Sequence, residues 1–143
     1  EIDRQWLHLG DPVYDSWFRQ HLREVADTLD EAGVPVVWAT LPHVRLAPTG
    51  DLEGDWTTVA DNDPARVDRL NEIVRSVAAG HDRSTVVDLG AWAQRLPRGE
   101  FAPGYRAEGR DLTEQGAVSA AAWMIPELLD VLGVDDDASE TDG

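Results

Sequence analysis

The fold is decided by two short apolar runs, the first of which reads Val34-Pro35-Val36-Val37-Trp38-Ala39-Thr40-Leu41. The second reads Ser84-Thr85-Val86-Val87-Asp88-Leu89. Short continuous runs rich in β-branched residues are typical of strands buried on both faces of a parallel sheet. We therefore predict two neighbouring parallel strands, over residues 34–41 and 84–89.

Helical patterns precede both runs. The pairs at residues 11–12 and 63–64 are both Asp-Pro, which suits the N-cap and first turn of a helix. The apolar stripes behind them are Phe18, Leu22, Val25, Leu29 and Ala32, then Val67, Leu70, Val74 and Val77. A last helix is predicted behind Thr113. Helices that alternate with strands indicate an α/β protein with right-handed crossovers.

Two strands are too few for a stable parallel sheet that is covered on both faces. We expect the missing strands to come from residues N-terminal to Glu1 or from another chain. Residues 1–133 are predicted to form one partial domain. Residues 134–143 hold five acids and no large apolar side chain except Val134, so this tail is predicted to be disordered. Within the domain, Asn71 is interpreted as a surface polar residue and Asp88 as a strand-end polar residue.

Composition excludes several classes of function. The net charge is −16, all twelve basic residues are Arg, and they form no basic patch, which argues against nucleic-acid binding. Cysteine is absent, so thiol catalysis and thiolate metal sites are excluded. The four His residues show no metal-ligand spacing, and we predict no metal and no cofactor. No apolar run reaches the roughly 20 residues of a membrane span, and no signal-peptide pattern is present.

One stretch carries a resemblance to a known family: Tyr105-Arg106-Ala107-Glu108-Gly109-Arg110-Asp111-Leu112-Thr113-Glu114-Gln115-Gly116-Ala117. It resembles the last signature block of the SGNH hydrolases, a superfamily of esterases, lipases and O-acyltransferases. Gly109, Leu112, Thr113, Gly116 and the alanine-rich segment behind them match that block. Glu108 stands at the family's catalytic Asp and Asp111 at its catalytic His.

The layout of the chain widens the resemblance to residues 6–132. The segments at 6–12, 35–42, 63–71 and 86–89 are similar in order and spacing to the SGNH domains fused to bacterial membrane-bound O-acyltransferases. The resemblance implies the C-terminal part of a three-layer α/β/α sandwich with a flavodoxin-like parallel sheet. It also implies an extracytoplasmic or cell-envelope location, a fusion to a membrane acyltransferase upstream, and acyl esters of envelope carbohydrates as substrates.

The catalytic parts of that family are incomplete in this sequence. Its Gly-Asp-Ser nucleophile block and its Gly-x-Asn-Asp block are both missing. The side chain of Asp111 has an ordinary pKa near 3.9, which makes it a poor general base at neutral pH. Loss of hydrolytic activity is therefore expected, and whether the chain is an enzyme stays open.

Other interpretations remain beside the enzyme. Glu108 and Asp111 would also suit the positive N-terminus of the following helix without any chemistry. His43 is the candidate substrate-binding residue, because it follows a strand at the edge where open α/β sheets bind ligands; the other interpretation is an ordinary loop residue with no chemical role. The chain as a whole can be a non-catalytic carbohydrate-binding or interaction module that kept the fold. A nucleotide-binding domain is disfavoured, because no Gly-rich loop follows a strand.

Overall fold

A computed structural model describes residues 7–47, 55, 57, 59–106 and 108–133. The predicted disordered tail at 134–143, most of the lead-in to Trp6 and much of the loop at 48–58 lie outside the described residues. The elements, in chain order, are α1 (Pro12–Glu31), β1 (Val36–Ala39), the 3₁₀ helix η2 (Ala60–Asn62), α2 (Pro64–Ala78), β2 (Ser84–Val87), α3 (Leu89–Gln94) and α4 (Glu114–Val131).

The predicted capping residues begin three of the helices. The side chain of Asp11 accepts a hydrogen bond from the backbone N–H of Val13 at the start of α1. Asp63 does the same for α2, and the Thr113 hydroxyl accepts from the Gly116 N–H at the start of α4. Each of these side chains satisfies an N–H that has no partner within its own helix.

Strands β1 and β2 are parallel neighbours, as predicted, with Val36 paired to Ser84 and Ala39 to Val87. Both are shorter than the apolar runs. Pro35 has no N–H to donate, so pairing starts after it. At the other end Asp88 leaves β2 to cap α3, where its side chain accepts from the backbone N–H of the third residue on.

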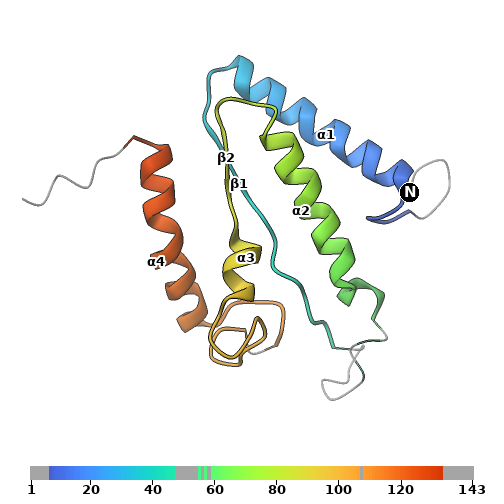
Figure 1. The fold of residues 1–143 in the computed structure, drawn as a ribbon, viewed down its shortest axis with the longest axis vertical. Coiled ribbons are helices and arrows are strands. Elements are labelled where there is room, and N and C mark those ends of the chain that lie inside the picture. The colour runs from blue at the N-terminus through green and yellow to red at the C-terminus, as the bar shows by residue number, and fades with distance from the viewer. Residues whose placement is uncertain (1–6, 48–54, 56, 58, 107, 134–143) are drawn as a thin grey trace, which may run out of the picture.

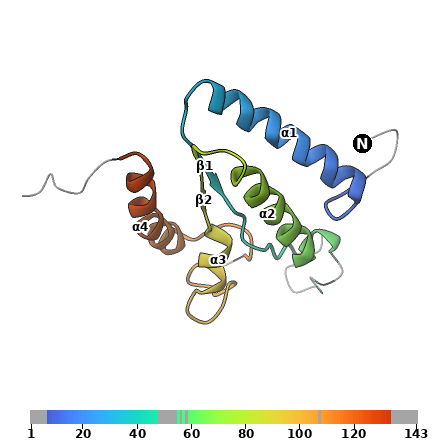
Figure 2. The ribbon, with the colours of Figure 1, turned by 45° about the horizontal axis from the view of Figure 1, so that its top comes forward.

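The helices lie on both sides of the two strands. Figures 1 and 2 show α1 and α2 together on one side and α4 on the other. On the first side, Ala26, Ile73 and Val77 form the buried core, and Trp38 of β1 packs against it. On the other side, the indole rings of Trp92 in α3 and Trp123 in α4 stack with their centres 5.9 Å apart. The molecule is thus a mixed α/β structure around a small parallel sheet.

The second face of β1 is only partly covered. Because side chains alternate along a strand, Val37 and Ala39 point away from Trp38. Val37 is 37% exposed and Ala39 is exposed as well. Among the described residues, β1 pairs with β2 alone, so its second edge carries no strand. None of the described helices combines the length and the apolar character needed to cross a membrane.

Candidate functional site

The carboxyl ends of the two strands are joined by a hydrogen-bond network around the buried side chain of Thr40. Thr40 is fully buried, and its hydroxyl donates to the Asp88 carboxylate at 2.7 Å and accepts from the Gly90 N–H at 2.9 Å. Arg75 of α2 donates to both Asp88 oxygens. Burial alone would raise the pKa of Asp88, but the hydrogen bonds from Thr40, the α3 backbone and Arg75 lower it overall. The Asp88 carboxylate therefore stays ionised, and its hydrogen bonds connect the end of β1 to α2 and to the start of α3.

Two asparagines position the segment that follows β1. The Asn71 amide accepts from the Leu41 N–H and donates to the Leu41 carbonyl, both at 2.8 Å. Asn62 makes the same pair of bonds to Leu46, at 2.6 and 2.7 Å. A side-chain amide that bonds both backbone groups of one residue takes the place of a neighbouring strand. Residues 41–46 are thereby held in an extended path along α2.

The prediction that Asn71 is a surface residue is wrong. Asn71 is only 5% exposed, because it shares the buried face of α2 with Val74 and Ala78, three and seven residues further on. The helical spacing from Asn71 to these two apolar residues was a signal for this placement. The predicted stripe of apolar residues left out Asn71 because its side chain is polar. It also left out Ile73, which is the most buried residue of this helix.

His43 lies between two carboxylates. Its Nδ1 is 3.0 Å from Glu100 and its Nε2 is 2.9 Å from Asp68 of α2. The backbone N–H of His43 also donates to Glu100, at 2.7 Å. The side chain of Glu100 is 11% exposed and that of Asp68 is 63% exposed, so the Glu100 contact is the shielded one.

The surroundings of His43 favour its charged form. Burial alone would lower the pKa of His43, but the hydrogen bonds and charges of Asp68 and Glu100 raise it above its ordinary value of 6.5. An imidazole that donates at both nitrogens is the imidazolium, which has no free lone pair to accept a proton. With a carboxylate at each ring nitrogen, the arrangement suits the cationic form, and the side chain links three segments of the chain.

A buried arginine lies next to this cluster. Arg106 is 2% exposed, and its Nη2 donates to the carbonyl oxygens of Gly109 and Arg110 at 2.8 and 2.9 Å. Its Nη1 is 3.6 Å from Glu100, and its guanidinium lies over the ring of Phe101. Burial lowers the pKa of Arg106, while Glu100 opposes that change. Arg106 thus connects the His43 cluster to the loop before α4.

The loop that carries the signature block lies against the segment after β1. The Arg45 N–H donates to the Gly109 carbonyl at 3.0 Å. Gly109 has a φ of +73°, and a Cβ there would lie 2.6 Å from the Cβ of Arg45. Only glycine meets both conditions without strain. Further along the block, a Cβ on Gly116 would collide with the Tyr105 carbonyl oxygen, so the start of α4 also needs glycine.

The two residues at the family's catalytic positions both point to solvent. Asp111 is 69% exposed on its side chain and pairs with the adjacent Arg110, whose Nη2 lies 2.8 Å away. The hydrogen bond from Arg110 lowers the pKa of Asp111 below its usual value. Glu108 is exposed. His43 is joined to the loop through Glu100 and Arg106 rather than by a bond to either acid.

Comparison with known proteins returns no match of any kind: no family model, no curated protein and no solved structure is significantly similar to this chain. The relationship to the SGNH hydrolases therefore rests on the sequence motifs and remains a prediction.

Proposed function

We propose that this chain is the C-terminal part of an SGNH-type domain that acts on ester-linked acyl groups of cell-envelope carbohydrates, and that its hydrolytic site is degenerate. The finer architecture, a three-layer α/β/α sandwich with further strands, belongs to the same proposal. So do the extracytoplasmic location and the upstream membrane acyltransferase.

The observation that carries the proposal is the position of the signature loop. Residues 108–113 lie beside the segment that leaves β1, at the carboxyl ends of two parallel strands, where ligands bind in open α/β sheets. The residues that match the non-catalytic positions of the family's block have structural roles in this fold. Gly109 and Gly116 are sterically required, and Thr113 caps α4 while its hydroxyl donates to the Gly104 carbonyl at 2.7 Å.

The chemistry of the described residues supports degeneracy. Activation of a serine nucleophile needs a base with a free lone pair near neutral pKa. Asp111 has a lowered pKa, and His43 is held by carboxylates at both ring nitrogens. Asp111 is therefore too weak a base for this step, and both ring nitrogens of His43 are engaged by carboxylates rather than free. We propose that the loop keeps its position beside the strands, while proton transfer from a serine to a base is lost.

The alternative is a carbohydrate-binding or interaction module, and one feature favours it. Trp17 of α1 is 41% exposed, and its ring lies 4.2 Å from that of His21 and 5.6 Å from that of Tyr14. An exposed aromatic surface of this kind is suited to stacking on a sugar ring. In that case Trp17→Ala would abolish binding to envelope polysaccharide.

Hydrolysis of p-nitrophenyl acetate tests the proposal. We expect residues 1–143 to show no turnover above buffer. In a longer natural polypeptide that contains this chain and a Gly-Asp-Ser strand, the double change Glu108→Asp with Asp111→His should raise turnover by about 10²–10⁴-fold, which is the usual contribution of a positioned general base.

The single variant Asp111→Ala is the matched control in that longer polypeptide and should restore nothing. If the unaltered polypeptide is already active, and neither Asp111→Ala nor the double change alters its rate, the assignment of the loop is wrong. His43→Ala would then be the first variant to examine.

A further inference from the structure

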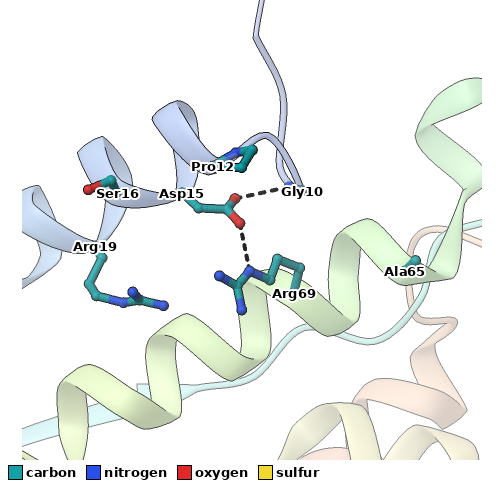
Figure 3. A pocket seen from close by; sticks show the side chains of 7 residues that line it. All are labelled: Gly10, Pro12, Asp15, Ser16, Arg19, Ala65 and Arg69. Carbon is teal, nitrogen blue, oxygen red and sulfur yellow. Dashed lines mark hydrogen bonds and ion pairs between the residues drawn. The ribbon is translucent and has the colours of Figure 1, made fainter.

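A pocket separate from the signature loop lies between the N-terminal halves of α1 and α2. It is open to solvent, has a volume of about 560 Å³ and is lined by Gly10, Pro12, Asp15, Ser16, Arg19, Ala65 and Arg69. Figure 3 shows the side chains of Arg19 and Arg69 entering the gap from the two facing helices. None of these residues takes part in the proposed hydrolytic site.

Asp15 of α1 and Arg69 of α2 are bonded to each other across the pocket. Asp15 is 4% exposed, and its carboxylate accepts from Arg69 Nε at 2.6 Å and from the Gly10 N–H at 2.9 Å. Burial alone would raise the pKa of Asp15, but these two bonds and the charge of Arg19 lower it overall. The carboxylate is thus ionised and bonded to Arg69, and it also interacts electrostatically with Arg19.

Arg19 is the arginine of this lining that makes no direct bond to a carboxylate in the described residues. Its Nε is buried without a hydrogen-bond partner, and in the part of the chain that the structure describes its guanidinium makes no ion pair. Figure 3 shows two hydrogen bonds to the carboxylate of Asp15 and none made by Arg19. Glu72, the second partner of Arg69, is outside the lining and 65% exposed. The lining therefore carries two cations and one anion.

We propose that this pocket binds a small organic monocarboxylate, whose carboxylate pairs with the guanidinium of Arg19. The planar guanidinium fork matches a carboxylate in a bidentate geometry. The exposed Ser16 hydroxyl, one helical turn before Arg19, offers a further donor. The body of the ligand would rest on Pro12 and Ala65, which supply the apolar part of the lining.

The charge of the site and of the chain favours one negative charge over two. The lining residues carry one more cation than anion, which balances a monoanion, and the net charge of −16 opposes a dianion more strongly than a monoanion. Phosphate monoesters, which carry close to two charges at neutral pH, are therefore the disfavoured class of anion.

Titration of the isotope-labelled chain with sodium acetate, followed by amide NMR, tests this site against sodium chloride at matched ionic strength. We expect saturating shifts at the amides of Gly10, Ser16 and Arg19. Arg19→Gln should weaken acetate binding by about ten- to a hundredfold, the usual loss for a hydrogen bond to a charged group. Arg23→Gln, an exposed arginine one turn further along α1, should leave the affinity unchanged.

Arg19→Lys keeps the charge and the alkyl stem, so it keeps the test decisive where Arg19→Gln fails to fold. We expect its affinity for acetate to lie between those of the natural chain and the Gln variant. The proposal would be overturned if sodium chloride reproduced the shifts, or if the natural chain and both Arg19 variants bound acetate with the same affinity. Tighter binding of inorganic phosphate than of acetate would also overturn it.

Discussion

His43 offers the sharpest test of how the site is held together. Its side chain connects the segment after β1 to α2 through Asp68 and to the loop after α3 through Glu100. The change His43→Gln removes the positive charge and keeps one amide donor of similar length. We expect this change to loosen the Glu100 side more than the Asp68 side.

The difference follows from exposure. The Glu100 contact is shielded, at 11% side-chain exposure, and a hydrogen bond to a charged group in such a place is worth about 1.5–3 kcal/mol. The Asp68 carboxylate is 63% exposed, and an ion pair so open to solvent contributes about 0–1 kcal/mol. We therefore expect His43→Gln and Glu100→Gln each to lower the free energy of unfolding by about 1.5–3 kcal/mol, and Asp68→Asn by about 0–1 kcal/mol.

The pH dependence has a definite sign. The pKa of His43 is raised in the folded chain above its ordinary value of 6.5. The contribution of His43 is therefore fully present below pH 6.5 and is lost as the pH rises through the higher folded pKa. The pKa of His81 is also raised, chiefly by its bond to Asp27, so some slope will remain after His43 is replaced.

Urea unfolding of the natural chain and the three variants, at pH values below and above 6.5, measures both effects. The stability of His43→Gln should change less with pH over this range than that of the natural chain. An Asp68→Asn variant that costs as much as Glu100→Gln would refute the reasoning from burial. An unchanged pH dependence in His43→Gln would refute the assignment of the imidazolium.

Two further predictions concern the framework around this cluster. Asn71→Ala should lower the free energy of unfolding by about 2–4 kcal/mol, because both backbone groups of Leu41 lose their partner; Asn71→Asp, which keeps one acceptor, should fall between. Gly116→Ala should cost about 1–3 kcal/mol in the same urea experiment, because its Cβ meets the Tyr105 carbonyl. Gly104→Ala is the control, since its Cβ would meet side-chain atoms only at 3.5 Å or more. Equal stability of the two alanine variants would contradict the steric argument.

The sequence was sufficient to predict the two strands and the helices α1, α2 and α4, because their signals are local. The Asp-Pro pairs at 11–12 and 63–64 set the starts of α1 and α2, and the two apolar runs set β1 and β2. The strand ends were less predictable. Residues such as Asp88 leave a strand when their side chains find a better partner in the next turn, which depends on the tertiary arrangement.

The site was predictable only in part, for a related reason. His43 was selected by its place after a strand, but its partners Asp68 and Glu100 lie 25 and 57 residues away along the chain. No local pattern connects charges at such separations. Arg106 was not selected either, since arginine is mostly a surface residue and its burial here depends on carbonyl groups of the following loop.

The exposed face of β1 shows where local pattern and surroundings disagree. A continuous apolar run predicts a strand covered on both faces, yet Val37 is 37% exposed and Leu41 is 47% exposed. Trp38, between them in the run, packs into the core on the α1 and α2 side. Val37 and Leu41 are thus apolar residues of the run that remain exposed in the described part of the chain. That mismatch supports the proposal of a larger α/β/α domain, in which β1 would lie in the interior of a wider sheet.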